Sequence, residues 1–409
     1  MIRACAPNRT VGRPPRLRYL AGAVLGVLAT GFAADPAGAA TVLRVCHSGC
    51  AFSQIQAAVN AAAPGDTVLV GTGTYAGGIV IGKRLTITGA GSGSTVISGG
   101  GPVVTVSGGP VVIKGVTVTG GDTAGDGGGI LNTATLTVSD AAVTDNTAFG
   151  SGGGIADEDF ATLTLNSDTV SGNSAAIGGG IEDVFHSSAT IRNAIIRRNA
   201  ATSVGGGIDV TGAALQLSDS EVNDNAATTS GFGGGVEISG IRYLGSSVAT
   251  ITGTVVNGNS AGWGGGIDVE AQVVATLAND IISRDVASTE GGGVASEWPQ
   301  SSLTLSHTSV TANTSGGDGG GISNVGMTRL TDDSVNANSA SGRGGGLFNG
   351  GISIGRNRGA GVLTLNADTS VNRNRAAAGG GIDVVAGTVT VDGATVRGNV
   401  PDNCRPTGC

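Results

Sequence analysis

The sequence predicts an all-β fold, a single-stranded right-handed parallel β-helix with three short strands per coil and about 12–13 coils. Three observations support this prediction. A Gly-Gly-Gly triplet followed by an aliphatic residue occurs ten times, and most neighbouring triplets are separated by 25 to 28 residues. An aliphatic residue followed three positions later by Asn or Asp accompanies the triplets. Between the two signals apolar and polar residues alternate, which is typical of a half-buried strand.

The two repeated signals define the strands of each coil. The aliphatic residues after the triplets are Ile130, Ile155, Ile181, Ile208, Val236, Ile267, Val294, Ile322, Leu347 and Ile382. The second signal extends from Val143…Asn146 to Val396…Asn399, with Asp285 replacing Asn in one repeat. We expect one strand after the glycines, one in the alternating stretch and one that ends at the Asn. Stacked Asn residues can exchange side-chain amide hydrogen bonds along the axis. Because one coil cannot bury its own inward residues, the coils must stack about 4.8 Å apart.

Residues 1–39 have the pattern of a secretory signal peptide. Five Arg residues precede the apolar stretch Leu20–Ala34, and Ala37-Gly38-Ala39 fits a cleavage site. The alternative, an uncleaved membrane anchor, is disfavoured because the stretch is shorter than the roughly 20 residues of a spanning helix. The sequence therefore predicts a protein that is secreted or displayed on the cell surface, with no membrane span in the mature chain.

The mature chain is expected to have three parts. Residues 40–66 should form an N-terminal cap with a Cys46–Cys50 loop and an amphipathic helix, residues 67–399 the β-helix, and residues 400–409 a cysteine-containing tail. The helix is expected from Ser53 to Ala63, with Ser53 and Gln56 as a capping box. It would cover strand edges that are otherwise unpaired at this end of the β-helix.

Four cysteines follow the signal peptide, namely Cys46, Cys50, Cys404 and Cys409. An even number in an exported chain favours disulfides, and we expect the local bridges Cys46–Cys50 and Cys404–Cys409. The alternative is a metal site that uses all four thiolates. It requires the two chain ends to meet, which an elongated fold does not allow.

The charge of the chain limits its partners. Loss of five Arg residues and Asp35 with the signal peptide lowers Lys+Arg from 22 to 17 and Asp+Glu from 30 to 29, which leaves a net charge of about −12. This charge and the 3% aromatic content argue against nucleic acid. The expected partner is a polysaccharide or a surface protein, and the chain is expected to be a monomer.

The candidate site lies on the middle coils. In the strand after the glycines, the outward position holds an acid on four successive coils: Glu182, Asp209, Glu237 and Asp268. We expect an exposed ladder of carboxylates about 4.8 Å apart. Close like charges raise one another's pKa or recruit a cation, and oxygen-rich clusters suit Ca²⁺. These four residues are weak calcium candidates, and Ca²⁺ is the single cofactor that the sequence suggests.

Two further acids, Asp157 and Asp183, occur at inward positions of the same strands, so that either those strands are short or the acids have a use. No residue is assigned a catalytic or cofactor-binding role, because the spacing of the acidic and basic residues does not indicate a catalytic arrangement.

The four coils that carry these acids share a second feature. On each of them the residue before the glycine triplet is apolar, and on two of them it is an aromatic residue, Phe232 or Trp263. Together with an insertion that contains Arg242 and Tyr243, these rings are candidate ligand-binding residues, because an aromatic face can stack on a sugar. The alternative is structural, in which outward acids keep a long sheet soluble and the apolar turn residues pack on one another.

Two resemblances follow from these motifs. The Gly-Gly-aliphatic and aliphatic-x-x-Asn pair resembles the repeats of polymorphic outer-membrane proteins, although Val or Ile replaces the usual Phe of the second motif. The opening FSQIQAAVNAAAPGDTVLVGTGTYAGGIVIGKRLTITG, Phe52 to Gly89, resembles the N-terminal cap of pectin-lyase-like β-helices. Together they cover residues 50 to 399. The first implies surface display and adhesion, and the second implies lyases, hydrolases or esterases that act on acidic polysaccharides.

The predicted function is that of a non-catalytic, exported interaction or adhesion protein, because the Gly-His-Gly and Arg-Ile-Lys motifs of pectin-lyase-like hydrolases are absent. The alternative is a carbohydrate-active protein, lyase-like or glycan-binding, that uses the face around the four acids and Trp263. If the chain is an enzyme, the resemblance implies a polysaccharide lyase or glycoside hydrolase.

Overall fold

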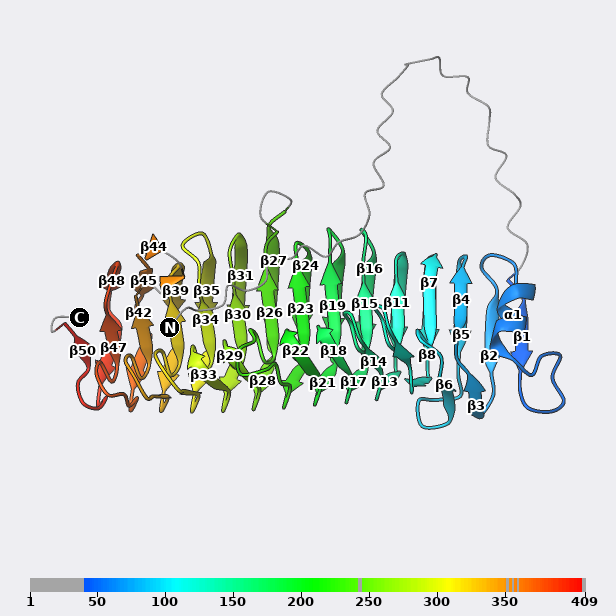
Figure 1. Ribbon diagram of the computed structural model, residues 1–409, viewed down its shortest axis with the longest axis horizontal. Helices are drawn as coiled ribbons and strands as arrows, with labels where there is room; N and C mark the ends of the chain where they lie inside the picture. Colours follow the sequence, from blue (N-terminus) through cyan, green and yellow to red (C-terminus); the bar gives the residue numbers. More distant parts are fainter. Residues whose placement is uncertain (1–39, 242–244, 351–352, 355–356, 359, 407–409) are drawn as a thin grey trace, which may run out of the picture. The chain divides into compact units, whose positions relative to one another are not determined.

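The computed structural model describes residues 40–241, 245–350, 353–354, 357–358 and 360–406 (Figure 1). The predicted signal peptide, residues 1–39, lies outside the described residues and stays a prediction. Within the described residues, no helix has both the length and the apolar character that a membrane crossing requires.

The described residues form a parallel β-helix, so the predicted fold class is confirmed. Three long parallel sheets follow its axis, and each coil contributes one strand to each sheet (Figure 1). In the part of the chain that the structure describes, sheet A has 14 strands, and sheets B and C have 13 strands each.

The strands of sheet A are β1 (Val42–Val45), β2 (Thr67–Val70), β5 (Leu85–Thr88), β8 (Val111–Lys114), β12 (Thr135–Ser139), β16 (Thr162–Asn166), β20 (Ser188–Arg192), β24 (Ala214–Ser218), β27 (Ser247–Thr252), β31 (Val273–Ala278), β35 (Ser302–Ser306), β39 (Met327–Thr331), β45 (Val362–Leu365) and β48 (Thr388–Val391). The strands of sheet B are β3 (Gly73–Ala76), β6 (Thr95–Ser98), β9 (Thr117–Thr119), β13 (Ala142–Thr144), β17 (Thr169–Ser171), β21 (Ile195–Arg197), β25 (Glu221–Asn223), β28 (Val255–Asn257), β32 (Ile281–Ser283), β36 (Ser309–Thr311), β40 (Ser334–Asn336), β46 (Ser370–Asn372) and β49 (Thr395–Arg397).

The strands of sheet C are β4 (Ile79–Gly82), β7 (Val104–Gly108), β11 (Ile130–Asn132), β15 (Ile155–Asp157), β19 (Ile181–Val184), β23 (Ile208–Thr211), β26 (Val236–Ser239), β30 (Ile267–Val269), β34 (Val294–Ser296), β38 (Ile322–Asn324), β42 (Leu347–Asn349), β47 (Ile382–Val384) and β50 (Cys404–Arg405). A short antiparallel pair, β43 (Ser353–Ile354) and β44 (Asn357–Arg358), follows β42. Strands β1 and β50 pair with β2 and β47, so the sheets extend beyond the limits 67–399 that we expected.

Each coil turns at residues in the left-handed backbone region. In one coil these are Asp140 (φ 51°), Asp145 (φ 55°) and Gly152 (φ 62°). Between the turns, the inward residues of the strands are fully buried, as Leu136 and Val143 illustrate. Stacking extends these positions into continuous aliphatic columns, which form the core that the sequence predicts.

The triplet Gly233-Gly234-Gly235 shows why glycine is needed at this corner. Gly233 has a φ of 59°, and a Cβ atom there would lie 2.6 Å from Cα of Glu237. Cβ atoms on Gly234 and Gly235 would lie 2.4 Å and 2.6 Å from carbonyl oxygens of the next coil. Both the left-handed conformation and the close approach of neighbouring coils therefore exclude side chains.

The repeated Asn residues form a ladder inside the turn, as predicted. Nδ2 of Asn173 donates to Oδ1 of Asn199 at 3.0 Å, and Nδ2 of Asn199 donates to Oδ1 of Asn225 at 3.0 Å. The ladder changes at Asp285, whose Oδ1 accepts from Nδ2 of Asn259 at 2.9 Å. A carboxylate has no amide hydrogen, so Asp285 contacts Asn313 through its backbone N–H alone.

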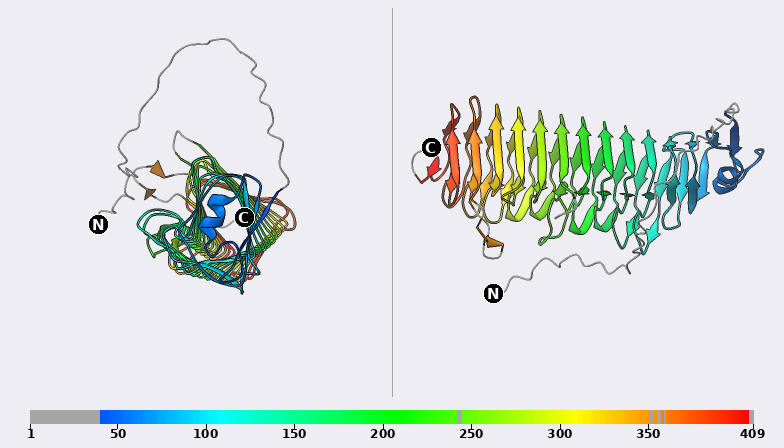
Figure 2. Two further views of the ribbon diagram at one scale, coloured as in Figure 1. Left: turned by 90° about the vertical axis from the view of Figure 1, so that its right-hand side faces the viewer. Right: turned by 90° about the horizontal axis from the view of Figure 1, so that it is seen from above.

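The chain between each Asn and the next triplet forms an arm, which the sequence analysis did not predict. The arms contribute two further four-stranded parallel sheets. Their strands are β10 (Asp122–Thr123), β14 (Thr147–Ala148), β18 (Ser174–Ile177), β22 (Ala200–Val204), β29 (Ser260–Trp263), β33 (Val286–Glu290), β37 (Thr314–Ser315) and β41 (Ser339–Ala340). Viewed along the axis, the arms form a narrower lobe beside the three-sided coil (Figure 2).

The N-terminal cap contains the expected helix in a shorter form, α1 (Ile55–Ala61), at one end of the β-helix (Figure 1). Its face with Ile55, Ala58 and Val59 is buried. The expected capping box is wrong, because Gln54 occupies the N-cap without a side-chain hydrogen bond. Oε1 of Gln56 accepts instead from the N–H of Val80 in β4, at 2.7 Å, which ties the helix to the first coil.

The disulfide Cys46–Cys50 is present, as expected. Cys404 is disulfide-bonded, and its expected partner, Cys409, lies outside the described residues.

Candidate acidic site on the middle coils

The four predicted acids form a ladder in register along sheet C. Glu182 pairs with Asp209, Asp209 with Glu237, and Glu237 with Asp268, on the successive strands β19, β23, β26 and β30. The expected exposure is wrong, because Glu182 is 5% exposed, Glu237 is 2% exposed, and the other two acids are fully buried. The ladder is therefore an internal feature, and a polymer in solution does not reach it.

The arms bury this ladder. The residue before each triplet follows the arm, and these residues pair from coil to coil in their own column: Ile177, Val204, Phe232 and Trp263. The first glycine of each triplet then contacts the strand of sheet C. A Cβ atom on Gly205 would lie 2.7 Å from Cβ of Asp209, and one on Gly264 would lie 2.7 Å from Cβ of Asp268.

We call this contact the seam. Its floor is the outward column of sheet C, and its cover is the column of residues that precede the triplets. On the middle coils the floor is acidic and the cover apolar. The rings of Phe232 and Trp263 stack with centroids 4.9 Å apart and an interplanar angle of 16°. These predicted ligand-binding rings therefore lie half-buried in the cover, where they shield the acids from water.

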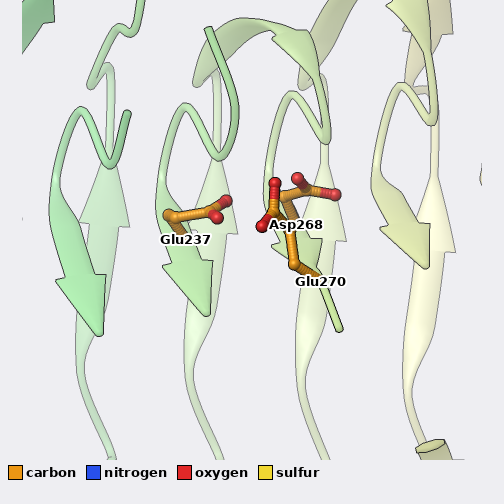
Figure 3. A group of neighbouring side chains, drawn as sticks. All are labelled: Glu237, Asp268 and Glu270. Carbon is orange, nitrogen blue, oxygen red and sulfur yellow. The ribbon is translucent and has the colours of Figure 1, made fainter. Parts of the chain in front are cut away.

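Three carboxylates gather at one point of the seam. One ligand oxygen from each of Glu237, Asp268 and Glu270 can be chosen so that all three lie within 4.8 Å of one another. Glu237 comes from one coil, and Asp268 and Glu270 come from the next (Figure 3). Sequence reasoning missed Glu270, which lies two residues after Asp268 and just beyond the end of β30 at Val269.

The surroundings of these acids favour their neutral forms. Burial is the main cause that raises the pKa of Glu182 and Glu237 well above the usual range, and the charge of neighbouring acids is the second cause. Burial is also the main cause that raises the pKa of Asp268. No oxygen of Asp268 accepts a well-formed hydrogen bond in the described part of the chain, and the backbone N–H of Val269 lowers its pKa less than burial raises it. Glu237 and Asp268 hydrogen-bond to each other when one of them carries a proton.

Asp157 and Asp183 form a second buried pair, inside the coil. Strands β15 and β19 continue through both residues, so the strands are not cut short. Nδ2 of Asn132 donates to Asp157, and Oγ of Ser187 donates to Asp183. Burial is the main cause that raises the pKa of Asp157 to about 9 and that of Asp183 to about 7.

The predicted wall of the site, Arg242 and Tyr243, lies outside the described residues. The residues that flank it, Ile241 and Gly245, pair in antiparallel fashion. The contribution of Arg242 and Tyr243 to ligand binding stays a prediction.

A cluster of exposed rings, which the sequence analysis missed, lies at the corner between sheets C and A. Phe160 is 75% exposed and Phe185 is 46% exposed. The ring of Phe160 stacks on that of His186, with centroids 5.2 Å apart. The N–H of Phe160 donates to the carbonyl of Phe185 at 3.2 Å, which joins the two coils. A sequence signal existed, since both phenylalanines occur in polar loop segments just before an alternating stretch.

The ring cluster occupies turn positions with a left-handed backbone. Phe160, Phe185 and His186 have φ values of 64°, 57° and 64°. Such conformations cost bulky residues about 1–2 kcal/mol each, and the turns of other coils place residues such as Arg198 and His307 in the same conformation. The N–H of His186 donates to the carbonyl of Gly212 at 2.8 Å, which ties the cluster to the next coil.

No protein-family model matches the sequence, and no curated protein sequence matches it. Among solved structures, this chain is similar to pectate lyase Pel9A, with 14% identity and a TM-score of 0.43 over 91% of this chain and 82% of that chain. It is also similar to alginate lyase AlyGC, with 12% identity and a TM-score of 0.45 over 89% of this chain and 53% of that chain.

A third similar structure is the A-module of the Azotobacter vinelandii mannuronan C-5 epimerase AlgE6, with 15% identity and a TM-score of 0.38 over 86% of this chain and 92% of that chain. The resemblance of the repeats to polymorphic outer-membrane proteins stays a prediction.

Proposed function

We propose that the chain is an exported glycan-binding protein whose binding residues are Phe160, Phe185 and His186. The observation that carries this proposal is that three exposed rings gather at one corner of two neighbouring coils. Exposed aromatic rings lose the stabilisation of burial, so their presence on a rigid corner favours a role in contact. The apolar face of a sugar ring packs on such a ring.

The position of the cluster supports this role. From β8 to β40 the corner between sheets A and B is two residues long in each coil, as with Asp140 and Ala141 between β12 and β13. The corner between sheets C and A varies, from residues 133–134 after β11 to residues 350–361 after β42. Binding residues are typically carried by the variable loops of a rigid scaffold, and the three rings lie at the variable corner.

The charge of the chain favours a neutral glycan. The chain beyond residue 39 carries a net charge of about −12, and Asp159 is exposed beside the rings. A polymer of uronic acids would be repelled at low ionic strength. The disulfide Cys46–Cys50 is in keeping with an exported protein that meets such polymers outside the cell.

The test is retention of the purified chain on immobilised neutral glycans, namely cellulose, chitin, xylan, β-1,3-glucan and starch, with pectate and alginate for comparison. We expect at least one neutral glycan to bind, and Phe160→Ala and Phe185→Ala to weaken its binding by about tenfold each. The folded state should be unaffected, because both side chains are exposed.

Phe149→Ala is the matched control. Phe149 is 83% exposed but lies on an arm, away from the corner of the three rings. The proposal is wrong if none of the glycans binds, if Phe149→Ala weakens binding as much as Phe160→Ala, or if the uronate polymers bind best at low salt.

A further inference from the structure

We propose that Glu237, Asp268 and Glu270 bind one divalent cation, Ca²⁺, inside the seam between two neighbouring coils. This inference is independent of glycan binding at the ring cluster. It concerns the junction of strands β26 and β30, where the carboxylates of the three residues converge (Figure 3).

The side chain of Asp268 is fully buried, and neither carboxylate oxygen accepts a well-formed hydrogen bond from the described residues. The backbone N–H of Val269 lowers the pKa of this group less than burial raises it. Oε2 of Glu237, a residue only 2% exposed, is in the same state. Buried polar groups without partners are costly, and the cost is larger for a charge.

Other buried acids of the same chain have different surroundings. Oδ1 of Asp168 accepts from the N–H of Ala141 at 2.9 Å, and Oδ2 accepts from the N–H of Asn166 at 2.7 Å. Asp383, on the floor of the last coil, has Nε of Arg405 at 3.9 Å. These acids have donors or a cation nearby, whereas the oxygens of Asp268 are directed toward other carboxylates.

Glu237 and Asp268 are not part of any salt bridge between the described residues. The next floor residue, Asp209, adds a further acid in register. A cation bound between the carboxylates would compensate this concentration of negative charge, and the apolar cover of Phe232 and Trp263 would strengthen the attraction by excluding water.

The donor set selects the kind of cation. Three carboxylates without His or Cys suit a hard cation, and they do not suit Zn²⁺ or Cu²⁺. Mg²⁺ usually retains several water molecules, for which a seam closed by two stacked rings is unsuitable. Ca²⁺ accepts flexible coordination by carboxylate oxygens, and the half-buried Glu270 leaves a route of entry.

The test uses the purified chain after treatment with EDTA. We expect 1 mM Ca²⁺ to raise the unfolding temperature by about 3 °C or more, and the same concentration of Mg²⁺ to have a clearly smaller effect. Tb³⁺, which replaces Ca²⁺ at oxygen sites and emits when a nearby tryptophan is excited, should bind and be displaced by Ca²⁺. Trp263→Phe should remove the sensitised emission and retain the effect of Ca²⁺ on unfolding, and Trp298→Phe should retain both.

The variants Asp268→Asn and Glu237→Gln should each weaken Ca²⁺ binding at least about tenfold. Both replace an acid with an amide of the same shape, so they should remain folded. If either one does not fold, Glu270→Gln, at a half-buried position, tests the same site. Asp383→Asn is the matched control, because it changes a buried acid of the same floor column and should leave Ca²⁺ binding unchanged.

The proposal is overturned if Ca²⁺ changes neither the unfolding temperature nor the Tb³⁺ emission of the unmodified chain. It is also overturned if Asp268→Asn binds Ca²⁺ as tightly as the unmodified chain, or if Asp383→Asn weakens binding equally. An equal effect of Mg²⁺ would contradict the assignment of the cation.

Discussion

The seam differs between the middle coils and the later ones. From β19 to β30 the floor consists of acids and the cover is apolar. From β34 to β42 the floor consists of Ala295, Ser323 and Phe348, and the charges lie in the cover. These cover residues are Glu290, Asp318 and Arg343. The same backbone arrangement therefore accommodates charge in two ways.

The later coils pair their charges. Nη2 of Arg343 lies 2.6 Å from Oδ2 of Asp318, and the guanidinium is 4.8 Å from the ring centroid of Phe348. Oγ of Ser323 donates to Oε2 of Glu290 at 3.2 Å. A half-exposed cover thus lets charged groups find partners and water, whereas an acid on the buried floor must have a proton or a cation.

The inward column of sheet C also accommodates polar groups in two ways. Strands β15 and β19 place Asp157 and Asp183 there, and the later strands β38 and β42 place Asn324 and Asn349 at the equivalent positions. Nδ2 of Asn324 donates to Oδ1 of Asn349 at 2.7 Å. An amide both donates and accepts, so it needs no proton from solvent to pair with its neighbour.

The largest expected effect comes from moving an acid to the floor of the later coils. Ser323→Asp would place a carboxylate in a fully buried position between the acids Glu290 and Asp318 of the cover. We expect a loss of about 3 kcal/mol or more in the free energy of unfolding, because the charge is unpaired. Ser323→Asn, of similar size but neutral, should lose clearly less. Denaturant unfolding measures both, and equal losses would show that charge does not distinguish the two halves of the seam.

The next effect is the dependence of stability on pH. The pKa values of Asp157 and Asp183 in the folded chain, about 9 and about 7, lie above the roughly 3.9 of an unfolded Asp. The folded state therefore binds more protons. The resulting stabilisation is complete below about pH 4 and is lost as the pH rises through the folded pKa values. Without added metal, we expect a lower unfolding temperature at pH 8 than at pH 5.

Two variants test the origin of this pH dependence. Each retained proton contributes about 1.4 kcal/mol per pH unit, so Asp157→Asn should flatten the profile. Asn324→Asp places an acid in the same column on a later coil and should steepen it. A profile that rises from pH 5 to pH 8, or that neither variant changes, would contradict the assignment to this column.

The smallest expected effect is a gain of stability at the Asn ladder. Asp285→Asn would supply the missing Nδ2 donor toward Oδ1 of Asn313 and remove a buried charge whose Oδ2 lacks a partner in the described residues. We expect a gain of about 1 kcal/mol in the free energy of unfolding. The reverse change on the next coil, Asn313→Asp, should cost a similar amount. A loss on Asp285→Asn would mean that the acid has a partner of its own.

The repeat itself made the register predictable. A period of 25 to 28 residues places equivalent residues above one another, so the sequence predicted the pairing of Glu182, Asp209 and Glu237, and the Asn ladder with it. Parity within the strand predicted that Asp209 points out of the coil. Both predictions follow from periods that a single sequence displays. One is the two-residue alternation along each strand, and the other is the repeat of the coil along the chain.

The burial of those acids could not be predicted in the same way. It depends on the arms, whose strands, such as Ser174–Ile177, are too short to show a hydrophobic alternation. The sequence contains one signal of this burial. An apolar cover residue such as Trp263 accompanies an acidic floor residue, whereas a charged cover residue such as Arg343 accompanies an apolar floor residue. Glu270 and the ring cluster depended on three-dimensional neighbours, since they lie beyond the regular strands.

From β8 to β40 the corner between sheets A and B keeps its length, whereas the corner between sheets C and A varies. This difference has a consequence for how such a protein changes. Lengthening a closed loop costs little additional entropy, so a new segment can be added at one coil while the cross-section of the others is kept. Side chains that project from such corners are then separated along the axis in steps of about 4.8 Å. A chain built in this way can match the repeat distance of a linear partner by choosing the coils that carry the contacts.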